Sequence, residues 1–139
     1  ETNPISECAK DKRGTGTHLA GTVAGKTHGA APRANVLGVK VLYPYVGDLY
    51  LGWAWKNWQF HEALDLIVSS TIRPAVVLVG VSASTEKWGT PAAVEAVVNS
   101  GIPFVVPAAG RNTEQDACTE QFGLIPEAIV VGVTDMSDE

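Results

Sequence analysis

Residues 75–108 read AVVLVGVSASTEKWGTPAAVEAVVNSGIPFVVPA, and this stretch decides the fold class. It opens with an apolar run at 75–81 and closes with another at 102–108. Such runs, rich in β-branched residues, are typical of strands buried on both faces of a parallel sheet. Between them, 91–100 begins with proline and is followed by glycine, which is the asymmetry expected of a helix. The stretch therefore predicts a parallel βαβ unit.

The same pattern extends in both directions from this unit. Upstream, 35–42 is a further near-continuous apolar run, 43–52 is predicted as a loop, and 53–70 has apolar residues at helical spacing. Downstream, a polar loop at 109–126 precedes a short apolar run at 128–133. The sequence therefore predicts an α/β fold, a three-layer doubly wound parallel sheet that is partial and has about four strands.

Ahead of the first predicted strand, residues 14–25 read GTGTHLAGTVAG and predict a short helix. Thr15 or Thr17 is expected to cap its start, because a threonine hydroxyl can accept a hydrogen bond from a free backbone N–H group there. Gly25 is expected to end it. The polar residues before Gly14 are predicted as coil.

Composition excludes several classes of protein. The chain has 139 residues, about one domain's worth, with 45% apolar and 18% charged residues, which argues against disorder. No apolar run approaches the 18 or so residues that a membrane span requires, so no membrane partner is expected. The net charge is −5 and the basic residues are scattered, so no nucleic-acid partner is expected either.

The ends and the cysteines add little. The chain begins at Glu1 without methionine or an apolar signal segment, so we expect a processed form or a piece of something longer. Cys8 and Cys118 are too few for a disulfide scaffold, and their spacing leaves open whether they pair with each other.

Several blocks, taken in order, resemble one family. The strings THLAGTVAG at 17–25, GAAP at 29–32 and LGVKVL at 37–42 look like the histidine block of the subtilisin-like serine proteases, peptidase family S8. VVPAAG at 105–110 and VGVTD at 131–135 match later blocks in the family's order. The resemblance is nearest to the proteinase K branch and covers nearly the whole chain.

The resemblance implies a single partial subtilisin-like peptidase domain over 1–139, running from the histidine block to the oxyanion block. It implies a secreted, extracellular serine endopeptidase that acts on polypeptide substrates through an Asp–His–Ser triad. The family's Asp and Ser blocks are not in the sequence, so we expect a truncated, catalytically inactive homologue. No cofactor and no metal ion are expected.

Two catalytic positions depart from the family pattern. The family reads His-Gly-Thr-His, with the first histidine as general base, whereas this chain has Thr15-Gly16-Thr17-His18. A threonine hydroxyl cannot take up a proton at neutral pH. The family's oxyanion asparagine corresponds to Arg111, whose long guanidinium is poorly suited to replace a short amide donor. Both positions are predicted to be non-functional.

The family's peptide-pairing strand corresponds to Gly80, Val81 and Ser82, the predicted substrate-binding residues. Pairing of this kind uses backbone groups, so it can survive a change of side chain. Ser82 replaces a glycine where the side chain of the cleaved residue would enter, which narrows that pocket.

Other interpretations of these residues remain open. His18 lies three residues after Thr15, on nearly the same helical face, and is an alternative base. Ser82 approaches a nucleophile elbow, although no helix follows it closely enough. Glycines at 14–16 resemble a nucleotide loop but lack the required preceding strand. The alternative function is a non-catalytic peptide- or protein-binding module, with a protein partner docking on a tryptophan-rich segment that contains Trp53, Trp55 and Trp58.

Overall fold

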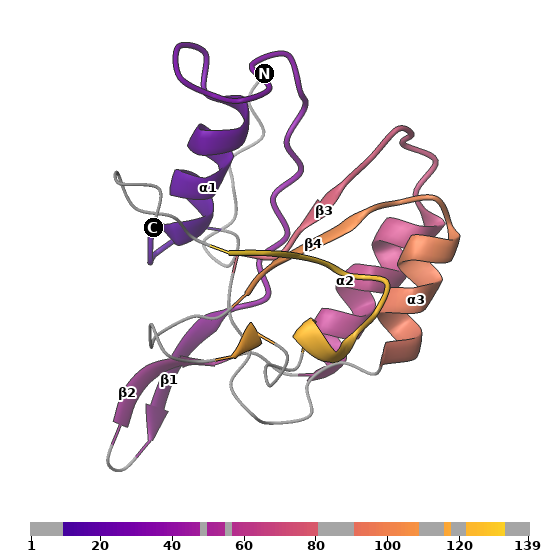
Figure 1. The fold of residues 1–139 in the computed structure, drawn as a ribbon. Helices are drawn as coiled ribbons and strands as arrows, with labels where there is room; N and C mark the ends of the chain where they lie inside the picture. The colour runs from indigo at the N-terminus through magenta and orange to yellow at the C-terminus, as the bar shows by residue number, and fades with distance from the viewer. Residues whose placement is uncertain are drawn as a thin grey trace. The chain divides into compact units, whose positions relative to one another are not determined.

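The computed structural model describes residues 10–47, 50–54, 57–80, 91–108, 116–117 and 122–132 (Figure 1). The chain divides into two compact units, 1–54 and 55–139, and each unit is described by itself. Among the helices in these ranges, none combines the length and the apolar character that a membrane crossing needs.

The described part of the first unit contains the helix α1 (Thr15–Ala24) and an antiparallel hairpin of β1 (Tyr43–Gly47) and β2 (Tyr50–Ala54). The helix confirms the expectation for 14–25. The prediction of a loop over 43–52 is wrong, because Tyr43 pairs with Ala54 and the ladder continues to Gly47 opposite Tyr50. Aromatic and β-branched residues in this segment favour strands, and each strand supplies the other's hydrogen-bond partners.

The strand predicted at 35–42 is not present in the structure. Val36, Leu37 and Val39 are 51%, 68% and 40% exposed, whereas a strand of a covered parallel sheet would bury such side chains. The physical reason is pairing: in the described part of this unit, β1 and β2 pair with each other, and no strand lies beside 35–42. An apolar run becomes a strand only when a neighbour accepts its backbone hydrogen bonds.

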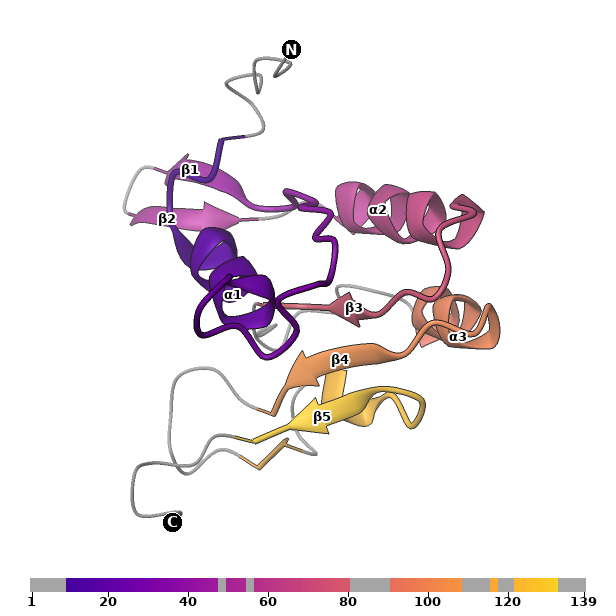
Figure 2. The ribbon, with the colours of Figure 1, turned by 90° about the horizontal axis from the view of Figure 1, so that it is seen from above.

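The second unit carries the predicted α/β architecture (Figure 2). Its three-stranded sheet is parallel throughout and has the strand order β3-β4-β5, with Val77 beside Phe104 and Val105 beside Ile129. The elements in chain order are α2 (Asn57–Ser69), β3 (Val77–Leu78), α3 (Pro91–Asn99), β4 (Phe104–Pro107), the 3-10 helix η3 (Phe122–Leu124) and β5 (Ile129–Val131).

Helices cover one face of this sheet. Phe104 and Val106 of β4 are almost fully buried together with Val94 and Val97 of α3, and α2 lies beside α3 (Figure 1). Alternate residues along a strand point to opposite faces. The other face accordingly carries Leu78, Ile129 and Val131, which are each about half exposed.

The end of α3 confirms the glycine signal that the sequence gives for it. Gly101 has φ of +83°, a left-handed conformation that glycine adopts without steric cost. Its N–H donates to the carbonyl of Val98 at 2.8 Å, and the N–H of Ile102 donates to that of Val97 at 3.4 Å. Val97 and Ile102 are both fully buried, so the turn delivers the chain directly into β4.

Three phenylalanines join separate elements of this unit. The ring of Phe122 in η3 lies 5.9 Å from that of Phe60 in α2 and 6.2 Å from that of Phe104 in β4, measured between centroids. All three are at least 96% buried. The segment 109–126 was predicted as polar loop, but its helical turn at Phe122 belongs to the core because that ring has apolar partners on both sides.

Replacing Phe122 by alanine should lower the free energy of unfolding by about 3–5 kcal/mol, because it removes a buried ring that contacts two others. Leu124→Ala in the same turn is the control, since Leu124 is 65% exposed and should cost within about 0.5 kcal/mol. Urea unfolding followed by circular dichroism measures both. Equal losses in the two variants would contradict the placement of Phe122 in the core.

Candidate functional site

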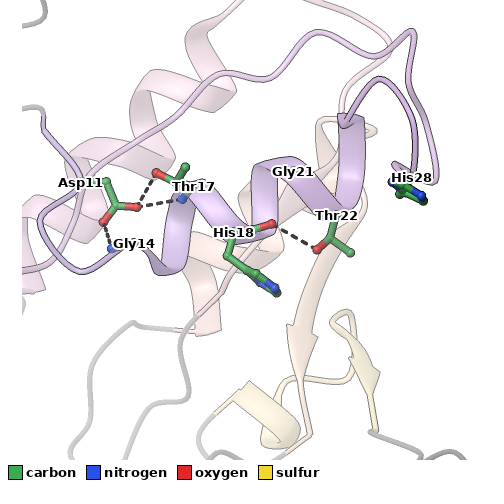
Figure 3. A pocket seen from close by; sticks show the side chains of 7 residues that line it. All are labelled: Asp11, Gly14, Thr17, His18, Gly21, Thr22 and His28. Carbon is green, nitrogen blue, oxygen red and sulfur yellow. Dashed lines mark hydrogen bonds between the residues drawn. The ribbon is translucent and has the colours of Figure 1, made fainter.

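The start of α1 is held by a single carboxylate, that of Asp11 (Figure 3). Its Oδ1 accepts hydrogen bonds from the backbone N–H groups of Arg13 at 3.1 Å and Gly14 at 2.8 Å. Its Oδ2 accepts two from Thr17, from the backbone N–H and the hydroxyl, both at 2.8 Å. These bonds satisfy N–H groups that a helix start leaves without an internal partner.

The predicted threonine cap is therefore wrong. The N-cap residue is Gly14, whose φ of +84° lies in the left-handed region, and no side chain at that position caps the helix. The Thr17 hydroxyl donates to Asp11 instead of accepting from the backbone. An ionised carboxylate is a stronger acceptor than a hydroxyl, which explains why Asp11 takes the capping role.

The hydrogen bonds change the acidity of Asp11. They lower its pKa from 3.8 to about 2, with the largest contribution from the Thr17 N–H, followed by the Thr17 hydroxyl and the Gly14 N–H. Each bond favours the ionised carboxylate, because only that form accepts from all four donors. At neutral pH the Asp11 carboxylate is therefore ionised.

Thr15 is the first residue of α1 and is partly buried. The sequence predicts that it occupies the base position, and that stays a prediction; its functional group is a neutral alcohol. Within the described ranges no hydrogen bond involves the Thr15 hydroxyl, so its side chain is not tied into the cap. The structure places the backbone of this position at the start of a helix, as the sequence predicts.

An open depression runs along α1 from Asp11 to the loop after the helix (Figure 3). His18 and Thr22 line it within the helix, and His28 lines it from the loop beyond. His18 is exposed and lies one helical turn after Thr15, about 4.5 Å further along the axis. The alternative in which His18 acts as the base stays a prediction.

The far end of α1 is fixed by a tight turn. Gly25 donates to the carbonyl of Gly21 at 2.8 Å, and Gly29 donates to that of Gly25 at 2.8 Å. A Cβ atom on Gly25 would collide with the carbonyl oxygen of Gly21, so no other residue fits there without a shift. The N–H of Ala31 also donates to the carbonyl of Val23 at 2.7 Å. Gly25 ends the helix, as predicted.

The other predicted site residues are only partly described. Gly80 follows β3 in the second unit and is partly buried, whereas Thr15 belongs to the first unit. The described ranges do not include Val81, Ser82 or Arg111, so the predictions for these three residues stay predictions. The same holds for Trp55 and for both cysteines. In the ranges the structure covers, no group of three or more His, Cys, Asp or Glu residues gathers that could hold a metal ion.

Comparison with known proteins finds relatives among the serine proteases. The chain is 36% identical over 138 residues, 99% of its length, to a cuticle-degrading serine protease of Orbilia oligospora. It is 32% identical over 148 residues to a subtilisin-like protease of Coccidioides posadasii and 35% identical over 145 residues to cerevisin of Saccharomyces cerevisiae, in both cases over its whole length. Along its whole length, the chain is similar to part of these subtilisin-like serine proteases. This confirms the resemblance found in the sequence.

The subtilisin-like chain spans only 30%, 29% and 22% of the length of these three relatives. No protein-family model matches it, and no solved structure matches it. The similarity to these relatives extends over the whole chain but over less than a third of each relative. The chemistry of this chain therefore has to be argued from its own residues.

Acid should weaken the start of α1 through Asp11. Because the folded-state pKa is depressed to about 2 from an ordinary 3.8, the contribution is complete above pH 4 and is lost as the pH falls toward 2. Unfolding of the chain and of Asp11→Asn, measured from pH 5 to pH 2, should show a stability difference that shrinks with acid. A difference that stays constant over this range would contradict the assignment.

Proposed function

We propose that this chain is the histidine-helix section of a subtilisin-like serine protease scaffold from which the proton-accepting step of peptide hydrolysis has been lost. The observation that carries the proposal is Thr15 at the first position of α1. The helix, its cap and its closing turn are formed, so the loss lies in one functional group and does not require a damaged fold.

The missing step is chemically specific. In a Ser-His-Asp mechanism an imidazole takes the proton from the serine hydroxyl during attack and later gives it to the leaving amine. A threonine hydroxyl accepts no proton at neutral pH, so it can do neither. Removing the histidine of such a triad lowers kcat by about 10⁶-fold. Arg111 in place of the family's oxyanion asparagine would lower the rate of hydrolysis further.

Support also comes from where the nearest imidazole lies. His18 follows the predicted base position by three residues, about 4.5 Å further along the α1 axis, so its side chain starts from a different backbone position. The ligand class under this proposal is polypeptide, and the compartment that the family implies is extracellular. Both follow from ancestry and are part of the proposal.

The proposal is tested by covalent labelling. The purified protein is incubated with a fluorophosphonate, which reacts with activated serines, and its intact mass is measured. We expect no adduct after hours, at a concentration that labels an active subtilisin-like protease completely in the same tube. A serine adduct would show that a proton acceptor operates despite Thr15, and peptide mapping of that adduct would distinguish Ser82 from the other serines.

A second candidate function, peptide binding without hydrolysis, is favoured by the edge of β3. The N–H groups of Val77 and Val79 donate to Pro103 and Val105, so these residues pair with β4. In a parallel ladder the alternate residues direct their N–H and C=O groups to the opposite edge, here Leu78 and Gly80. No strand of the described ranges pairs there. An extended peptide can add to such an edge through backbone bonds alone.

Leu78→Pro is the sharpest test of this second candidate. Proline removes the N–H that faces the open edge and leaves the bonds of Val77 and Val79 to β4 intact. Leu78→Ala is the matched control, because it shortens the side chain and keeps the N–H. Calorimetry with a capped Lys-(Thr-Val)₃ peptide should show binding to the chain and to Leu78→Ala, with loss in Leu78→Pro. Equal heats in all three, or none in the unmodified chain, would exclude this edge.

A further inference from the structure

We propose that Asp11 is the positioning residue for position 15: its carboxylate fixes the backbone on both sides of that position and places a full negative charge beside it. The inference rests on the proposed function only for the meaning of position 15. It assigns to Asp11 a role in the site and not only in the stability of α1.

The hydrogen bonds enclose position 15. Gly14, immediately before it, and Thr17, two residues after it, are both bound to the same carboxylate at 2.8 Å. Arg13 adds a third backbone donor at 3.1 Å. A backbone segment whose two ends share one rigid acceptor has little freedom between them, so the direction of the Cα–Cβ bond at residue 15 is set by Asp11.

The charge is close to this segment as well as bonded to it. A Cβ atom built on Gly16 would lie 3.5 Å from Oδ2 of Asp11, so the carboxylate lies against the backbone of the residue next to Thr15. The helix start adds the opposite field, because unpaired N–H groups give it a partial positive charge. A titratable group at position 15 would feel both, and Asp11 would oppose the helix by stabilising a cation.

The side chain at position 15 is left free by this arrangement. The carboxylate takes the hydroxyl of Thr17 but not that of Thr15, and no hydrogen bond in the described ranges involves the latter. The cap therefore fixes where a side chain at position 15 begins without occupying its functional group. Such a division suits a residue whose partner lies outside the helix, because its orientation does not depend on its own hydrogen bonds.

Asp11 could act only as a helix cap or also as a positioning residue, and the two roles predict different pKa values for an imidazole introduced at position 15. Thr15→His places a titratable group at the position, and its pKa is followed by NMR in the 139-residue chain. We expect Asp11→Asn in this background to lower that imidazole pKa by about half a unit or more, because the nearby negative charge is removed. Asp65→Asn, an equal loss of charge at an exposed position of α2 outside the cap, should not reproduce this shift.

Asp11→Glu gives the complementary measurement. The glutamate keeps the charge, but its extra methylene displaces the carboxylate from four donors at 2.8–3.1 Å. We expect the imidazole pKa to be retained, while the backbone order parameter at residue 15 falls from about 0.85 toward 0.6. Thr17→Val, which removes one bond and no charge, should lower the order parameter by less.

The outcomes decide the proposal. An imidazole pKa that is the same with Asp11 and with Asp11→Asn, while circular dichroism shows α1 intact, would overturn it. If Asp11→Asn unfolds α1, the other two variants decide: an order parameter at residue 15 unchanged in both Asp11→Glu and Thr17→Val would overturn it. No step requires hydrolysis, so failure here is separate from failure of the labelling experiment above.

Discussion

Four hydrogen bonds to the Asp11 carboxylate determine where the first helix begins. The helix needs them because it has little else to hold it: none of its ten residues is buried, and two of its interior positions are glycine. Glycine inside a helix costs about 1 kcal/mol relative to alanine, and helices this short are marginal in water. At the other end, the turn at Gly25 and Gly29 satisfies the last carbonyls. The hydrogen bonds at both ends of α1 offset the low stability of its glycine-containing interior.

The second unit is held together differently, by burial. Phe104 and Val106 face α3 on one side of the sheet, and Phe122 closes the cluster from a segment that is otherwise rich in polar residues. The opposite face and the outer edge of β3 remain exposed within this unit. The two units thus differ in what stabilises them: the first contains a helix fixed at its ends, and the second contains a parallel sheet packed on helices.

The sequence predicts the elements whose signals are local. The helix at Pro91–Asn99 and its exit at Gly101 follow from proline and glycine at fixed offsets, and β4 follows because its apolar run meets a partner on either side. The strand at 35–42 could not be excluded from its own residues, since pairing depends on a neighbour elsewhere in the chain. The hairpin at 43–54 was not predicted for the same reason, because each of its strands depends on pairing with the other.

The candidate site shows the same division. Position 15 was singled out from the sequence, because the string around it resembles a family pattern, and its role stays a prediction. Asp11 was missed, because its bonds span two to six residues and depend on the left-handed turn at Gly14. An acid three residues before a glycine that opens an apolar helical stretch is the signal that could have revealed it.

The central claim is that the scaffold retains its histidine helix and lacks its proton acceptor. The rate of hydrolysis of a peptide anilide by the purified protein, measured from pH 5 to pH 9, tests this most directly. The account predicts the buffer rate throughout, with no inflection. A rate above buffer that rises with an apparent pKa near about 6.5, the ordinary value of an imidazole, would contradict it.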